Sequence, residues 1–87
     1  MLKIIDFYAD WCAPCQIMGP FIDEFKKTFE GKAEFAKVNV DSDMDTAQKY
    51  SIMSIPTFVI EKDGNEIDRK TGAIPKKSLE DWIKSYL

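Results

Sequence analysis

Apolar positions follow two different spacings along the chain, and these spacings predict four strands and three helices. Residues 2–9 are apolar at odd and even positions alike, which is typical of a central strand covered on both faces of its sheet. Residues 33–40 and 55–61 predict two more strands. Residues 66–71 predict a fourth strand, and their many charged side chains indicate an edge of the sheet.

A helical spacing of apolar residues begins just after the first strand. It predicts a helix over residues 12–29, kinked at Pro20 because proline cannot donate the backbone hydrogen bond that continues the helix. Asp41 and Ser42 are expected to cap a short helix that ends near residue 50. A last helix begins near Pro75, since proline is favoured in a first helical turn. Its apolar positions predict four buried side chains: Leu79, Trp82, Ile83 and Tyr86.

The order of these elements is β-α-β-α-β-β-α. Two right-handed crossovers predict three parallel strands, and the Asp63-Gly64 turn predicts a hairpin that adds one antiparallel edge strand. The fold class is therefore α/β, with a four-stranded mixed sheet flanked by three helices. The 87 residues contain no linker, repeat or low-complexity segment, so we expect residues 1–87 to form a single domain.

Charge and composition exclude several classes of function. The net charge of −3 and the absence of a basic patch argue against binding to nucleic acid or to an anionic membrane. No apolar run approaches the roughly 18 residues of a membrane span, and the first residues do not resemble a secretory leader. We therefore expect a cytoplasmic protein with no membrane partner.

The chain has two cysteines, Cys12 and Cys15, at the junction of the first strand and the first helix. In a reducing compartment such a pair is catalytic, redox-sensing or metal-binding. Zinc prefers four ligands, and the chain has no histidine and no third cysteine. We therefore expect no metal, although a zinc site shared between two molecules and a pair of inert core cysteines stay open as alternatives.

The position of the pair favours reversible exchange between a dithiol and a disulfide. Cys12 lies where a helix begins, and unpaired backbone N–H groups there stabilise an anion, which predicts a thiol pKa below the roughly 8.5 of free cysteine. Cys15 lies about one turn further along the same helix face. From there it can attack a mixed disulfide formed at Cys12. Pro14 fixes the backbone at the helix start and holds the two sulfurs close.

The chain resembles the thioredoxin family over nearly its whole length. Residues 6–15 match the active-site signature of that family, and Pro20 matches its helix kink. Residues 36–41 match the following strand and residues 54–57 the cis-proline loop, while two later glycines, Gly64 and Gly72, also coincide. The resemblance implies a monomeric protein-disulfide reductase without a cofactor of its own. It also implies client proteins that carry disulfides and an electron donor like thioredoxin reductase.

The resemblance also implies roles for four residues. Cys12 is the attacking thiolate and Cys15 the resolving thiol. Asp6, a carboxyl group in an apolar strand, is expected to have a raised pKa because of desolvation, and to accept the proton of Cys15 through water. Lys37 lies near Asp6 and tunes it. Two alternatives stay open: Asp6 is a structural partner of Lys37, or Lys37 is an ordinary surface lysine.

A groove for clients is implied beside the cysteines. Pro56 is expected to be cis and to face the disulfide, and the backbone of Ile55 to pair with an extended client segment. A trans Pro56 and a Trp11 that only packs in the core are the alternatives. The full set of expected client-binding residues is Trp11, Ala13, Pro14, Ile55, Pro56, Gly72 and Ala73.

The chain departs from the family pattern in several places. It starts where the second strand of the family starts, so we expect a fold without the usual first strand and helix, with residues 33–40 at an edge of the sheet. Ala13 replaces a glycine, Tyr8 a tryptophan, and Gln16 a lysine or arginine. Two other functions stay open: a glutathione-dependent reductase like glutaredoxin, which Trp11 and Ala13-Pro14 argue against, and a redox-inert docking module.

Overall fold

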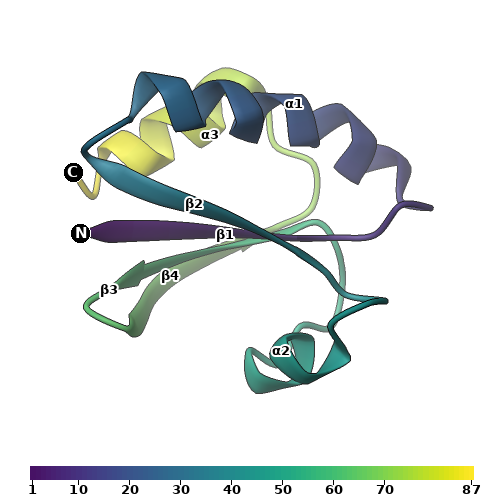
Figure 1. Cartoon of the computed structure of the whole chain (residues 1–87). Helices are drawn as coiled ribbons and strands as arrows, with labels where there is room; N and C mark the ends of the chain where they lie inside the picture. Colours follow the sequence, from purple (N-terminus) through teal and green to yellow (C-terminus); the bar gives the residue numbers. More distant parts are fainter.

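A computed structural model describes all 87 residues as a four-stranded sheet with three helices. Helices α1 and α3 cover one face of the sheet, and α2 lies beyond the other face at one end (Figure 1). The predicted fold class and element order are confirmed. In chain order the elements are β1 Leu2–Tyr8, α1 Ala13–Thr28, β2 Ala33–Asn39, α2 Met44–Lys49, β3 Thr57–Lys62, β4 Asn65–Thr71 and α3 Lys76–Lys84.

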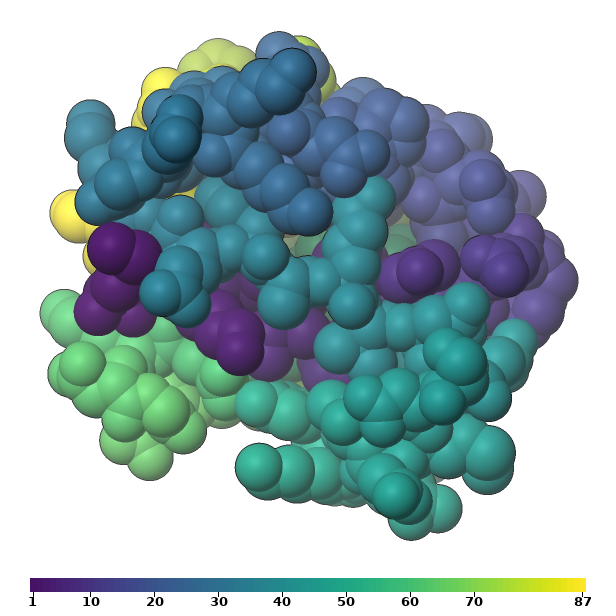
Figure 2. Space-filling view, in the orientation of Figure 1, coloured from purple at the N-terminus to yellow at the C-terminus, as the bar shows by residue number.

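Strand β1 is central, as its two-sided apolar pattern predicted. The strands lie in the order β2-β1-β3-β4, so β2 and β4 are the edges. Asp6 of β1 is aligned with Lys37 of β2 on one side and with Phe58 of β3 on the other. Figure 2 shows β1, in purple, only in small patches between the neighbouring segments.

The expectation of three parallel strands is wrong. Only β1 and β2 are parallel, while β3 runs antiparallel to β1 and β4 antiparallel to β3. The reason is the length of α2. Its six residues span about 9 Å, whereas the seven-residue β2 spans about 23 Å. The chain therefore does not return to the end of the sheet where β2 began, and β3 starts beside the end of β1.

Three helix starts and ends differ by a residue or two from the sequence expectation. The N-cap of α2 is Asp43, whose Oδ1 accepts the backbone N–H of Thr46 at 3.2 Å, rather than Asp41 or Ser42. Pro75 is the N-cap of α3 and lies just before its first turn. Helix α1 continues through Pro20 and ends at Thr28.

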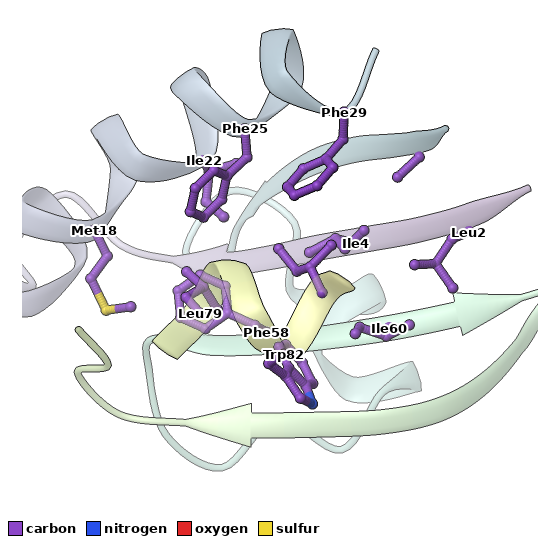
Figure 3. Close-up of a cluster of buried hydrophobic side chains, with 12 residues drawn as sticks. Leu2, Ile4, Met18, Ile22, Phe25, Phe29, Phe58, Ile60, Leu79 and Trp82 are labelled. Atoms are coloured by element: carbon purple, nitrogen blue, oxygen red, sulfur yellow. The ribbon is translucent and has the colours of Figure 1, made fainter. Parts of the chain in front are cut away.

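The main core lies between the sheet and the helix pair α1 and α3. Side chains from α1 point down toward the sheet, and those of β1, β3 and α3 meet them (Figure 3). Even-numbered positions of β1 face this core, so the side chain of Asp6 follows Leu2 and Ile4 on the same face. The twelve buried members are Leu2, Ile4, Met18, Ile22, Phe25, Phe29, Ala33, Phe58, Ile60, Leu79, Trp82 and Ile83.

A smaller cluster lies on the opposite face of the sheet. Ile5, Phe7 and Val59 are buried there under side chains from the α2 segment, including Tyr50 and Ile52. The Tyr50 hydroxyl donates to Oε2 of Glu61 at 2.6 Å and so ties this segment to β3. The Tyr50 ring also packs on Phe7, with ring centroids 5.3 Å apart, which places this segment beside the later part of β1.

Replacing Ile22 with alanine tests the packing of α1 on the sheet. Ile22 is fully buried, so Ile22→Ala is expected to lower the free energy of unfolding by about 2–5 kcal/mol. Ile17 lies on the same helix but is 65% exposed, and Ile17→Ala is expected to change it by at most about 0.5 kcal/mol. Urea denaturation of the oxidised protein measures both values, and equal losses in the two variants would contradict this core.

Candidate functional site

Cys12 and Cys15 form a disulfide at the junction of β1 and α1. Their Cα atoms are 5.2 Å apart, and each residue is 5% exposed. Both pack with Ala9 in a small cluster that Tyr8, Val40 and Ile55 cover. The two cysteines are thus held in place by the end of the central strand.

The local sequence explains how the helix begins at this pair. Cys12 is the N-cap of α1, and its Sγ accepts the backbone N–H of Cys15 at 3.2 Å. Pro14 lies in the first turn, where its missing N–H would have had no helical partner. The Sγ atom of Cys12 therefore lies where the free N–H groups and the helix dipole favour a negative charge, as expected from the sequence.

The loop before β3 lies against the cysteines. The Ile55–Pro56 peptide bond is cis, as expected. Thr57 Oγ1 donates to the carbonyl oxygen of Ser54 at 2.6 Å, and the backbone N–H of Gly72 donates to the carbonyl oxygen of Pro56 at 2.8 Å. The first bond lies within the proline loop, and the second fixes the loop after β4 next to it.

An apolar groove of about 390 Å³ runs beside the disulfide. It is lined by Trp11, Val40, Ile52, Met53, Ser54 and Ile55. Trp11 is 71% exposed, so it is not a core residue, and its indole Nε1–H donates to Asp41 Oδ2 at 2.7 Å. Of the other expected client-binding residues, Ala13, Pro14 and Ala73 are exposed at the surface.

A second cavity, of about 260 Å³, lies on the other side of the disulfide between α1 and the sheet. Its lining includes Asp6, Cys15 and Lys37. The other lining residues come from the end of β1, the loop after it and α1: Tyr8, Asp10, Gln16, Gly19, Pro20 and Asp23. Asp6 is 3% exposed, and its carboxyl group makes no hydrogen bond or ion pair with another protein group. The cavity therefore joins the buried carboxyl group to the second cysteine.

Burial dominates the electrostatics of Asp6. Desolvation raises the pKa of its carboxyl group from 3.8 to about 6; the Lys37 ammonium opposes this rise, and the Asp23 carboxylate adds to it. Lys37 is not bonded to Asp6. Its Nζ forms an ion pair with Asp23 Oδ1 at 2.9 Å and donates to the carbonyl oxygen of Gly19 at 3.4 Å.

Sequence reasoning missed several residues of the site. Asp23 lies two helical turns after Cys15 on the same face of α1, and this i, i+4, i+8 spacing through Gly19 was the available signal. Asp41 lies two residues after the end of β2, and that end lies beside the end of β1. No local pattern marks Met53 as part of the groove. No group of three or more histidine, cysteine, aspartate or glutamate side chains is placed to hold a metal ion.

A cysteine pair that opens a helix at the end of a central strand, with a buried carboxyl group behind it, defines a thiol–disulfide oxidoreductase. The family model described as Thioredoxin matches residues 1–85. A thioredoxin of Staphylococcus aureus is 40% identical over 86 residues, which cover 99% of this chain and 83% of that protein. The chain belongs to the thioredoxin family.

Solved thioredoxin structures agree with this assignment. The X-ray structure of Fasciola hepatica thioredoxin has a TM-score of 0.92 and 41% identity, over 99% of this chain and 81% of that one. Plasmodium falciparum thioredoxin has a TM-score of 0.91 and 40% identity, over 99% of this chain and 82% of that one.

The protein is a protein-disulfide reductase that uses the Cys12/Cys15 dithiol. Family membership implies disulfide substrates and, in general, a thioredoxin reductase as electron donor. None of its helices is long and apolar enough to cross a membrane.

Replacing Asp6 with asparagine is expected to stabilise the oxidised protein at neutral pH. The pKa of Asp6 in the folded protein, about 6, exceeds the ordinary aspartate value of 3.8 that applies in the unfolded chain. Folded Asp6 therefore binds more protons than unfolded Asp6 between these values, so its effect lowers stability as pH rises from 4 to 6. At pH 7.5 Asp6→Asn is expected to gain about 2–3 kcal/mol.

Urea denaturation of both proteins at pH 3.5 and pH 7.5 measures this effect. The gain is expected at pH 7.5 and is expected to be largely lost at pH 3.5, where Asp6 is mostly protonated in both states. An Asp6→Asn variant that is no more stable than the parent at pH 7.5 would show that burial does not penalise the ionised carboxyl group.

Proposed function

We propose that Cys12 attacks client disulfides, that Cys15 resolves the mixed disulfide, and that Asp6 accepts the proton of Cys15. The observation that carries this assignment is the asymmetry of the pair. Cys15 lines the cavity that contains Asp6, whereas Cys12 is not part of its lining and is the N-cap of α1. One sulfur thus has an anion-stabilising helix start and the other has a proton acceptor.

In the first step, the Cys12 thiolate attacks one sulfur of a client disulfide. A bond forms between Cys12 and that sulfur, the client S–S bond breaks, and the second client sulfur leaves as a thiolate. The N–H group of Cys15, which donates to Cys12 Sγ in the disulfide form, also favours the thiolate. This step requires no other proton donor or acceptor in the protein.

In the second step, Cys15 must lose a proton before it attacks the sulfur of Cys12. The proton passes through water in the 260 Å³ cavity to the ionised Asp6 carboxylate. The new Cys12–Cys15 bond displaces the second client thiolate. A pKa of about 6 suits Asp6 to this task, because the group is mostly ionised at pH 7 yet more basic than an exposed aspartate. Lys37 moderates that pKa from the wall of the cavity.

The groove beside Cys12 holds the client as an extended segment. The Ile55 backbone, next to the cis bond of Pro56, makes no backbone hydrogen bond within the protein and is free to form strand-like hydrogen bonds with a client. The exposed indole of Trp11 and the exposed surface at Ala13 and Pro14 flank one side, and the loop at Gly72 and Ala73 flanks the other. Hydrogen bonds to the backbone allow many client sequences to bind.

The setting of this activity follows from the same chemistry. We infer a monomer that works as a single domain over residues 1–87 in the cytoplasm, where a reducing environment keeps client disulfides transient. A flavin enzyme like thioredoxin reductase, using NADPH, regenerates the dithiol. In a coupled assay, NADPH with thioredoxin reductase is expected to support turnover, and glutathione with glutathione reductase is not. The reverse preference would identify a glutaredoxin-like activity.

Replacing Cys15 with serine is expected to trap the client on Cys12. The variant completes the first step but has no thiol for the second, so a mixed disulfide accumulates with an oxidised test peptide. Mass spectrometry of the quenched reaction measures the adduct. The control Cys12→Ser is expected to form none, and an adduct on Cys15 in that control would reverse the assigned roles.

A further inference from the structure

Lys37 lies beside Asp6 in the sheet but forms no ion pair with it. The two residues are aligned on neighbouring parallel strands, and both line the same cavity. The Lys37 ammonium instead reaches across to α1. There it binds Asp23 at 2.9 Å and the Gly19 carbonyl oxygen at 3.4 Å. The helix thus supplies both acceptors of this ammonium.

We propose that Asp23 is a positioning residue that anchors the Lys37 ammonium on α1 and so keeps it from forming an ion pair with Asp6. The proposal rests on the proton-acceptor role of Asp6 for its kinetic consequence alone. The anchoring of Lys37 by Asp23 does not depend on that role. Asp23 does not line the client groove, and it acts through Lys37.

The consequence follows from the groups that surround Asp6. The charged and titratable groups around the cavity are Asp10 and Tyr8 near the end of β1, Cys15 and Asp23 on α1, and Lys37 on β2. The partner of Asp6 on β3 is the uncharged Phe58. Lys37 is therefore the one cation among these groups, and its distance from Asp6 sets how readily the carboxylate takes a proton.

Without Asp23, the Lys37 ammonium would turn toward the Asp6 carboxylate, since that carboxylate has no other ionic partner in the protein. An ion pair with Lys37 would make Asp6 a weaker proton acceptor for Cys15. The present arrangement agrees with this, because Lys37 lowers the pKa of Asp6 and Asp23 raises it. Asp23, which itself lines the cavity, thereby keeps the acceptor basic by holding Lys37.

The local sequence provides this anchor at little cost. Cys15, Gly19 and Asp23 follow one another at four-residue spacing, so they form one line along α1. Gly19 has no side chain, and a Cβ there would lie 3.6 Å from the Lys37 ammonium, in van der Waals contact with it.

The test is a carboxyl-carbon NMR titration of Asp6 in the oxidised protein. Asp23→Asn is expected to lower the Asp6 pKa by about 0.5 unit, and Asp23→Glu, which still reaches Lys37, to restore most of the parent value. Glu24→Gln is the matched control. Glu24 is the next residue on the helix and pairs with Lys76 at 2.6 Å, away from the cavity, so its loss is expected to leave the Asp6 pKa unchanged.

A double-mutant cycle separates anchoring from direct charge repulsion between Asp23 and Asp6. With Lys37→Met present, Asp23→Asn is expected to shift the Asp6 pKa by less than half of its effect in the parent. An equal shift in both backgrounds would overturn the anchoring role, because Asp23 would then act on Asp6 directly. An unchanged or higher Asp6 pKa in Asp23→Asn would overturn it as well.

A kinetic readout keeps the two proposals distinguishable. The rate of client release from a preformed mixed disulfide at Cys12 is measured against pH, and its acid limb is expected to move to lower pH in Asp23→Asn together with the Asp6 titration. If the titration moves and the acid limb does not, the anchoring stands and the proton-acceptor role of Asp6 is wrong.

Discussion

The burial of one carboxyl group behind the disulfide is the constraint on which the rest of this site depends. Asp6 continues a row of apolar side chains on β1 that faces α1, and its neighbour on β3 is Phe58. An ionised group in such a place is costly, and its pKa of about 6 records that cost. A cavity, an ammonium held by another carboxylate and the Cys15 sulfur surround it in place of a direct ionic partner, so the carboxylate keeps its basicity.

The short α2 explains how the second half of the site reaches the cysteines. Since β3 is antiparallel to β1, its first residue, Thr57, lies beside Phe7 near the end of β1. The Ile55–Pro56 loop that precedes it therefore arrives next to Cys12. A third parallel strand would have started at the opposite end of the sheet, about 20 Å away at 3.3 Å per residue. The unexpected direction of β3 is thus a requirement of the site.

Local chemistry made much of this molecule predictable from the sequence, and long-range geometry did not. The elements, the central place of β1, and the position of Cys12 at a helix start follow from periodicity and spacing. Periodicity is the same for a strand run in either direction, so it gave no guide to β3. The Lys37–Asp23 ion pair depends on how α1 crosses β2, and the Trp11–Asp41 hydrogen bond depends on where two loops meet. Neither arrangement is encoded in a short stretch of chain.

The disulfide separates two tasks that place opposite demands on their surroundings. On the Cys12 side, the groove at Trp11 and Met53 is open and apolar, as binding of varied client segments requires. On the Cys15 side, the cavity is polar and holds charges at fixed positions, as a proton acceptor requires. Because Lys37 is held from α1 and not from the groove, a client in the groove need not disturb the charges around Asp6. In the proposed mechanism, client preference and proton transfer can therefore vary independently.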